Sequence, residues 1–146
     1  MPTTGPINGT LLKVYRDTGS STFVALGHAT TNSFSASHSP RSITSQDSGG
    51  NDESLEGLRS YSISVSGFVA DDATEGVAEY LDALISNSDR GAITWQYTTN
   101  VTGDRLISGD GWIESIEKSN GGPEETATFN ISIKVTGAIT ATTVSV

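Results

Sequence analysis

The stretch RSYSISVSGFVA (59–70) decides the fold class. Its large apolar residues fall on one side of a two-residue alternation: Tyr61, Ile63, Val65 and Val69. The intervening positions are serines: Ser62, Ser64 and Ser66. A period of two is typical of a strand with one buried and one solvated face. The sequence therefore predicts a half-buried antiparallel strand here.

Strand patterns also occur on both sides of this stretch. We expect strands at residues 10–17, 22–27, 28–40, 92–99, 105–118 and 126–137. In the last of these, the residues predicted to face inward are Phe129, Ile131, Ile133 and Val135. Gly109 and Gly111 suggest a bulge within 105–118. The first two strands are close enough in sequence to form a hairpin.

Residues 71–91 give the one convincing helix pattern. Asp72 and Glu75 have the spacing of a capping box, with Thr74 as a competing N-cap. Its apolar residues recur every three or four positions: Val77, Tyr80, Leu81, Leu84 and Ile85. Gly76 is predicted inside this helix, at a cost of about 1 kcal/mol relative to alanine. A lone amphipathic helix must bury its apolar side against a sheet.

The element order predicts an α+β chain that is mostly β, an antiparallel β-sandwich or barrel with one packed helix. A single domain is expected over residues 1–146. Three segments lie outside its regular elements: a flexible N-terminal arm at 1–9 with Ile7 as its anchor, a long inter-strand insertion at 41–58, and a small polar C-terminal tail at 138–146. This tail is expected to be free to add a strand to another molecule.

Composition narrows the function classes. The chain has 17 acidic and 8 basic side chains and a net charge of −9, which disfavours tight binding to nucleic acid or an anionic membrane. It has no cysteine, so disulfides and thiolate metal sites are excluded. No apolar run is long enough for a membrane helix, and the N-terminus lacks the features of a signal peptide.

Few residues match known catalytic or metal-binding motifs, so an enzyme is not predicted and no cofactor or metal is assigned. His28 and His38 lie ten positions apart and form no metal-binding motif. The acids between Asp47 and Glu56 invite a calcium interpretation, but their spacing does not fit an EF-hand loop. A weak cation site in this segment stays open as an alternative.

The serine face has two interpretations. If the strands at 28–40 and 59–70 are neighbours, Ser62, Ser64 and Ser66 align with Ser33, Ser35 and Ser37. Such a face is either an ordinary solvated surface or the lining of a wet passage through which another molecule moves.

Two longer stretches, 56–84 and 111–139, resemble the major tail tube proteins of long-tailed bacteriophages and related gene transfer agents. The pieces that carry the resemblance appear in order: the serine-alternating strand from Arg59 to Gly67, the segment from Ile113 to Glu117, and the strand from Glu125 to Ser132. The chain then closes on Gly137 and Ala138. The resemblance covers roughly residues 10–140.

The resemblance implies a structural virion protein of the tail, made in the bacterial host cytoplasm. It implies hexameric rings of this chain, stacked into a tube through which double-stranded DNA passes without specific binding during genome ejection. Further implied partners are a tape measure protein, a tail terminator, and baseplate or distal tail proteins; no membrane is implied. Six chains of −9 would carry −54 per ring, so the bore would repel phosphate.

Site residues follow from the same resemblance. The residues expected at contacts between subunits or rings are Ile7, Asp47, Asp52, Glu53, Leu55, Glu56, Leu58 and Arg59. The residues expected to face the lumen are Ser33, Ser35, Ser37, Ser62, Ser64, Ser66, Glu114 and Glu117, with Asp104 and Asp110 as further candidates. The alternatives are a tube protein of a contractile tail or injection system, and an extracellular β-sandwich that binds a cation or sugar.

Overall fold

The computed structural model describes residues 2–19, 22–70 and 76–145. The strands are β1 (Lys13–Asp17), β2 (Phe23–Ala25), β3 (Ala29–Ser42), β4 (Ser54–Phe68), β5 (Ala92–Thr98), β6 (Arg105–Ser119) and β7 (Thr128–Thr143). Between them lie the 3₁₀ turn η1 (Gln46–Ser48) and the helix α1 (Val77–Ile85). This succession of elements and the α+β class confirm the prediction from the sequence.

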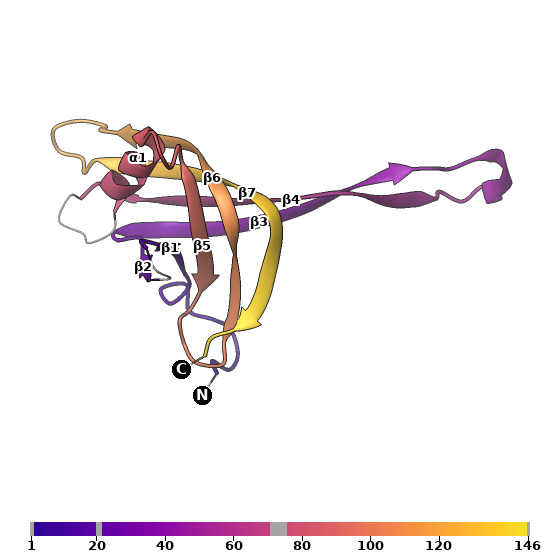
Figure 1. The fold of residues 1–146 in the computed structure, drawn as a ribbon, viewed down its shortest axis with the longest axis horizontal. Coiled ribbons are helices and arrows are strands. Elements are labelled where there is room, and N and C mark those ends of the chain that lie inside the picture. The colour runs from indigo at the N-terminus through magenta and orange to yellow at the C-terminus, as the bar shows by residue number, and fades with distance from the viewer. Residues whose placement is uncertain (1, 20–21, 71–75, 146) are drawn as a thin grey trace.

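The seven strands form one antiparallel sheet in the order β2-β1-β5-β6-β7-β4-β3. The sheet curls until its ends approach each other, and Figure 1 shows β1 and β2 close to β3. The Phe34 ring on β3 lies 6.0 Å from the Tyr97 ring on β5, measured between centroids. The Asn32 side-chain amide on β3 donates to the Leu12 carbonyl at 3.1 Å. The result is a barrel-like sandwich around one core.

The core consists of the inward-facing residues predicted by the alternation. The most deeply buried side chains, each at 1% exposure or less, include Ile63 and Val65 of β4, Trp95 of β5, and Phe129, Ile131 and Ile133 of β7. The predicted bulge is present, because the pairing of β6 with β7 shifts between Ser108 and Asp110. At Gly111, the other glycine of the predicted bulge, an added Cβ would lie 2.9 Å from the Lys134 carbonyl oxygen, so the missing side chain lets β7 approach closely.

The helix ends earlier than predicted, and the predicted apolar side packs inward except at its C-terminal end. Gly76 is the N-cap rather than an interior residue, so the predicted cost of a glycine inside the helix does not apply. The Gly76 N–H donates to the Glu79 carboxylate at 2.7 Å. The capping residues predicted at 72, 74 and 75 lie outside the described residues. Val77, Tyr80 and Ala83 are buried, whereas Ile85, predicted to be apolar-facing, is 68% exposed. The Arg16 guanidinium lies over the Tyr80 ring and completes the packing of α1 on the sheet.

The three irregular segments are more ordered than the sequence suggested. Residues 41–42 and 54–58 of the predicted insertion are strand, since β3 and β4 continue into it as a long hairpin that projects from the body (Figure 1). Residues 138–143 of the predicted tail belong to β7, and residues 140–143 of them pair with β6 in the same chain. The N-terminal segment is held by Thr3 rather than Ile7, since Thr3 bonds to Asp104 while Ile7 is 49% exposed.

Candidate assembly surfaces

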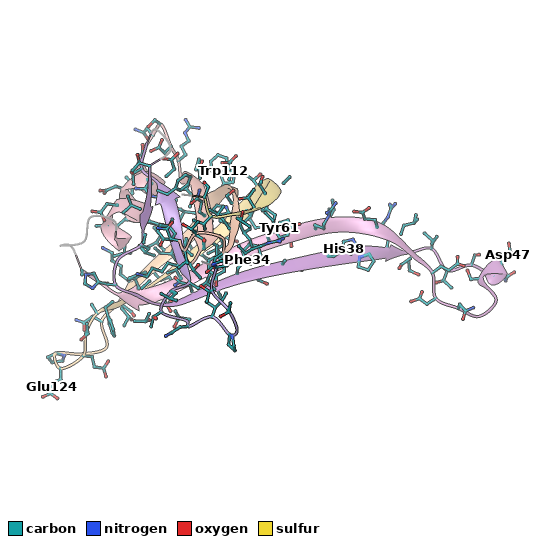
Figure 2. All side chains as sticks on the ribbon, turned by 90° about the horizontal axis from the view of Figure 1, so that it is seen from below. Phe34, His38, Asp47, Tyr61, Trp112 and Glu124 are labelled. Atoms are coloured by element: carbon teal, nitrogen blue, oxygen red, sulfur yellow. The ribbon has the colours of Figure 1, made fainter. Side chains whose placement is uncertain are left out.

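The most prominent surface is the projecting hairpin formed by residues 38–59, hereafter the arm. Figure 2 shows it leaving the body near Phe34 and Tyr61, passing His38 and ending at Asp47. β3 and β4 stay paired along it, from His38↔Arg59 to Ser42↔Ser54. An extended hairpin of this length has no core of its own. Its surface is therefore available to other molecules.

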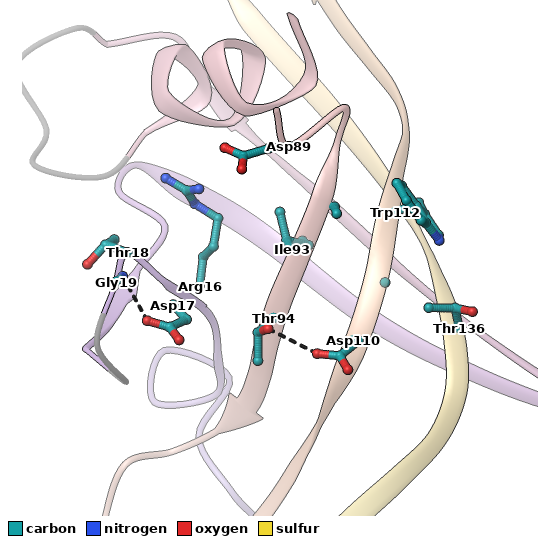
Figure 3. A pocket seen from close by; sticks show the side chains of 12 residues that line it. Arg16, Asp17, Thr18, Gly19, Asp89, Ile93, Thr94, Asp110, Trp112 and Thr136 are labelled. Atoms are coloured by element: carbon teal, nitrogen blue, oxygen red, sulfur yellow. Dashed lines mark hydrogen bonds between the residues drawn. The ribbon is translucent and has the colours of Figure 1, made fainter. Parts of the chain in front are cut away.

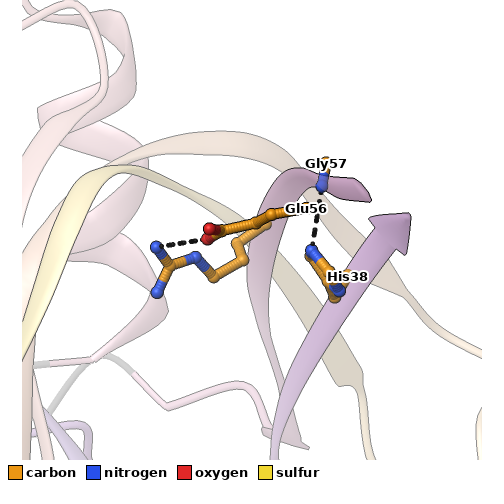
Figure 4. A network of polar contacts seen from close by, with 4 residues as sticks. His38, Glu56 and Gly57 are labelled. Atoms are coloured by element: carbon orange, nitrogen blue, oxygen red, sulfur yellow. Dashed lines mark hydrogen bonds and ion pairs between the residues drawn. The ribbon is translucent and has the colours of Figure 1, made fainter. Parts of the chain in front are cut away.

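A bulge bends the arm near its base. The pairing shifts between Ser39 and Arg41, where Pro40 sits on the edge strand β3, which tolerates a missing N–H. A Cβ at Gly57 would lie 1.6 Å from the Ser39 carbonyl oxygen, so only glycine allows this close approach. The Gly57 N–H donates to His38 Nε2 at 3.1 Å, and Arg59 pairs with Glu56 at 3.1 Å (Figure 4).

The tip of the arm is held by short-range hydrogen bonds. Ser45 caps η1, and the turn leaves through Gly49 and Gly50, which both have positive φ. Thr44 Oγ1 donates to the Asp52 carboxylate at 2.6 Å. Asp47, Asp52 and Glu53, predicted at subunit contacts, are all exposed here. This part of the insertion, which the sequence placed outside the regular elements, therefore has a defined local structure.

Apolar side chains are exposed along the arm. Leu58 is 85% exposed, Leu55 47% and Ile43 45%. Leu58 pairs with Ser39, and the same register places Ser60 opposite Ser37, so Leu58 continues the row of serines outward on the same face. Isolated exposed leucines are common, but several on an arm without a core mark an interaction surface.

The helix-free side of the sheet carries the hydroxyl groups, and it is called the polar face below. Ser33, Ser35 and Ser37 of β3 lie directly opposite Ser64, Ser62 and Ser60 of β4, whereas Ser66, also expected in this alignment, lies opposite Thr31. β7 continues the rows, since Ser64 pairs with Ser132 and Ser66 with Asn130. β3 and β4 are thus neighbours, and the hydroxyls of β3, β4 and β7 form one continuous surface.

The acids predicted for the lumen divide into two groups. Glu117 is exposed opposite Asn130, and Glu114 is exposed in a second bulge of β6, between Ile113 and Ser115. Asp110 is paired with Thr136 and accepts a hydrogen bond from Thr94 Oγ1 at 2.9 Å. These three can contribute charge to the polar face or its border.

Asp104 was wrong as a lumen candidate, because it is 6% exposed and holds the N-terminal segment. Its carboxylate accepts from the Thr3 hydroxyl and the Thr3 N–H, each at 2.6 Å, and from the Thr99 hydroxyl at 2.5 Å. These bonds, those from the Thr3 and Thr99 side chains first, lower the pKa of Asp104 below its ordinary value. The sequence offered no signal for this role beyond the position of Asp104 in a turn.

A hollow of about 430 Å³ lies at one end of the sheet between the β1–β2 turn and β6. Figure 3 shows Asp17, Asp89 and Asp110 around it, with Trp112 on its rim. Asp17 accepts from the Gly19 N–H at 2.8 Å. Among the residues that the structure describes, no group of three or more His, Cys, Asp or Glu is placed to hold a metal ion. No described helix is long and apolar enough to cross a membrane.

These features define a class of protein: a small β-rich structural subunit with a hydroxyl-lined sheet face and a projecting arm. The model of the family described as phage tail tube protein matches residues 8–141. Because this match spans nearly the whole chain, the chain belongs to the phage tail tube protein family, and its role in the tail tube is structural. Comparison with curated proteins gives no match.

Solved structures agree with this assignment. A chain from the tail of an empty gene transfer agent particle, refined with C6 symmetry, is 26% identical with a TM-score of 0.78, over 94% of this chain and 99% of that one. The tail tube protein of SPP1 is 19% identical with a TM-score of 0.74, over 97% and 81%. A sheath/tube terminator of an extracellular contractile injection system is 15% identical with a TM-score of 0.58, over 95% and 98%. The SPP1 protein and the contractile injection system protein are less than 25% identical to this chain, so their likeness shows a shared fold alone.

Proposed function

We propose that this chain polymerises as stacked hexameric rings into the tail tube of a phage or related particle, through which DNA passes during genome ejection. The observation that carries the proposal is the arm, a long exposed hairpin with apolar side chains and no core. The C6 symmetry of the similar gene transfer agent tail supports six subunits per ring.

In the proposed tube the polar face lines the bore. The hydroxyls of Ser33, Ser35, Ser37, Ser62, Ser64 and Ser66 offer no fixed positive charge to phosphate. Glu114 and Glu117 add negative charge, and six chains of −9 give −54 per ring. Because like charges repel across a narrow channel, DNA moves through such a bore without adhering.

The arm makes the contacts between subunits or rings. Leu55 and Leu58 are its apolar anchors, and burying them on a neighbour removes apolar surface from water. Asp47, Asp52, Glu53, Glu56 and Arg59 surround these anchors with charge and favour one docking position over others. Ile7, half exposed in the N-terminal segment, joins the same set of contacts.

The proposed location is the tail of the virion, after synthesis in the bacterial cytoplasm. A tape measure protein inside the bore, a terminator at one end and distal tail or baseplate proteins at the other are the further partners. A tube of a contractile system is the second candidate, supported by the likeness to the contractile injection system protein. That likeness is weaker, with a TM-score of 0.58 against 0.78 for the gene transfer agent tail.

Negative-stain microscopy of the purified chain tests the proposal. We expect rings or rods with a central hole and six subunits per turn, increasing with protein concentration. The control is the same preparation with and without calcium, because a sugar- or cation-binding module would stay monomeric and respond to its ligand instead. A chain that remains monomeric at all concentrations contradicts the proposal.

A further inference from the structure

The loop between β6 and β7 contains the sequence SNGGPEE (119–125), in which an asparagine is followed directly by a glycine. Figure 2 shows this loop, labelled at Glu124, projecting from the body on the side away from the arm. Asn120 and Gly121 are both exposed. The same dipeptide occurs once more in the chain, at residues 8–9, which are also exposed. The two sites therefore invite a comparison.

An exposed asparagine that precedes a glycine can lose its side-chain amide without an enzyme. The backbone nitrogen of the glycine attacks the asparagine Cγ, so that a new N–C bond closes a cyclic imide while the bond from Cγ to Nδ2 breaks. The proton of the attacking N–H leaves with Nδ2 as ammonia. Water then opens the imide at either of its two carbonyls, which gives aspartate or isoaspartate. Glycine favours the attack because it has no Cβ beside its nitrogen and permits a wide range of backbone angles.

The Asn120 side chain is oriented for this reaction. Its Oδ1 accepts a hydrogen bond from the Gly122 N–H at 3.2 Å. Such an Asx turn folds the carboxamide back over the peptide that follows it. The Asn120 Cγ therefore faces the peptide that contains the Gly121 nitrogen, and the hydrogen bond to Oδ1 draws electron density away from Cγ.

The backbone at Asn120 can take the angles that ring closure requires. The ladder between β6 and β7 ends at Ser119↔Thr128. Outside the strand ladders, none of the backbone hydrogen bonds between described residues involves Asn120 or Gly121. The next turn begins only at Gly122, whose carbonyl accepts from the Glu125 N–H at 3.1 Å. Rotation at Asn120 thus leaves the described backbone hydrogen bonds intact.

Asn8 is held more firmly than Asn120. Its backbone carbonyl accepts from the Leu11 N–H at 2.9 Å, which closes a turn. Its Oδ1 accepts from both the N–H and the hydroxyl of Thr10, at 3.1 and 3.0 Å. Closure of the imide turns the Asn8 backbone and carboxamide out of this conformation, so these hydrogen bonds oppose it. The same dipeptide is thus restrained at one site and free to rotate at the other.

We propose that Asn120 is a site of spontaneous deamidation, at which the chain converts its own asparagine to aspartate and isoaspartate with water as the co-reactant. The modification adds one carboxylate to a loop that already contains Glu124 and Glu125, in a chain of net charge −9. Isoaspartate also carries the main chain through its side-chain carbon, which lengthens the loop. The inference is independent of the proposed tube function, because the reaction takes place within one chain.

Peptide mapping of the aged full-length chain tests the inference. Purified chain is kept in neutral buffer, sampled over time and briefly digested with trypsin under mildly acidic conditions. Cleavage after lysine separates the two sites into peptides 1–13 and 119–134. Mass spectrometry measures conversion as a gain of one mass unit, and fragmentation assigns the residue and distinguishes isoaspartate from aspartate.

We expect Asn120 to convert about tenfold faster than Asn8, or more, with isoaspartate among the products. Asn130 is an internal control, because it lies in the same peptide but within β7 and precedes Ile131. It is paired with Ser66 on one side and Glu117 on the other, so its backbone cannot turn toward a cyclic imide. Asn130 should stay unchanged.

Gly121→Ala tests the route of the reaction. The three atoms nearest to an added Cβ at Gly121 belong to the Glu125 carboxyl group, which can swing aside, and Gly121 is not among the glycines with positive φ. The variant should therefore fold like wild type, which thermal melts verify, and convert about tenfold more slowly because the Cβ hinders the attacking nitrogen. The matched control is Gly122→Ala, whose Cβ enters open space and which keeps the N–H bonded to Asn120. Its rate should stay within about twofold of wild type.

Three outcomes would overturn the inference. Equal rates at Asn120 and Asn8 would show that the loop does not favour the reaction. An Asn120 that stays intact while the urea-unfolded chain converts would show that the folded loop protects it. Aspartate without isoaspartate, or an unchanged rate in Gly121→Ala, would show that water attacks Cγ directly and that no imide forms. None of these outcomes alters the proposed tube function, which microscopy of the polymer tests separately.

Discussion

At the residue scale, single positions decide whether the described contacts form at all. Gly57 allows the Ser39 carbonyl to approach within a distance that any Cβ would block. Gly67 does the same for His28, whose carbonyl oxygen would lie 2.2 Å from an added Cβ. Both glycines lie in β4, next to shifts in its pairing with β3. Their small size, rather than a left-handed backbone, is what the strand requires.

Asp104 supplies a prediction at this scale. Its pKa is lowered in the folded chain, so its contribution to stability is present above the pKa of an unfolded aspartate, about 3.9, and is lost as pH falls through the lower folded pKa. We expect Asp104→Asn to lower the thermal midpoint at neutral pH and to flatten the loss of stability in acid. Differential scanning calorimetry from pH 7 to pH 2 measures both.

Asp89→Asn is the matched control, because Asp89 is exposed in the loop after α1. It should leave the pH dependence below pH 4 nearly unchanged. Equal pH profiles for wild type and Asp104→Asn would show that the hydrogen bonds from Thr3 and Thr99 do not stabilise the charged carboxylate.

At the element scale, the arm is where the sequence and the structure differ most. Its acids and glycines suggested a loop without regular structure, since the segment has little to bury. Strand pairing needs only backbone groups, however, and β3 and β4 continue their ladder as far as Ser42↔Ser54. The regular elements therefore extend beyond the apolar pattern that first identified them.

The arm gives a prediction about assembly. Leu58→Ser removes an apolar side chain that is 85% exposed, so the free energy of unfolding of the monomer should stay within about 0.5 kcal/mol of wild type. Burial in an interface is worth about 1.5–3 kcal/mol for a leucine, so the critical concentration for polymerisation should rise about tenfold or more. Sedimentation measures the second quantity and denaturant unfolding the first.

Ile85→Ser is the control, because Ile85 is 68% exposed on α1, away from the arm. Hydrogen exchange adds an independent measurement, with amides of residues 45–57 exchanging fast in the monomer and slowly in the polymer. Equal exchange in both states, or equal effects of the two substitutions, would contradict a role of the arm in assembly.

At the scale of the whole molecule, one curled sheet presents two different sides. The inner side, with α1, holds the core, and the polar face carries hydroxyls across β3, β4 and β7. With a net charge of −9, the chain as a whole repels polyanions. With this division, a single sheet provides both the packed core of the subunit and, in the proposed tube, the lining of the bore.

The polar face gives a prediction for DNA. Ser64→Lys places six lysines per ring in the proposed bore, and the resulting tubes should retain duplex DNA at low salt. Ser88→Lys makes the same change in net charge on the loop after α1 and should not retain it. Filter binding from about 50 to 200 mM salt measures retention, with a steeper salt dependence for Ser64→Lys. Equal retention by both variants would show that the face does not line the passage.

The sequence by itself determined the fold class, the order of elements and the core side of each long strand, whereas the register of the serine rows came from the structure. These properties depend on the local alternation of apolar and polar residues, which can be read from the amino-acid sequence alone. Only the tertiary structure decided that Asp104 anchors the N-terminal segment, that Ile85 is exposed, that residues 140–143 pair with β6, and that the insertion is an ordered arm. Each of these depends on which distant segment lies alongside, and backbone pairing between distant segments leaves little trace in the identity of the side chains.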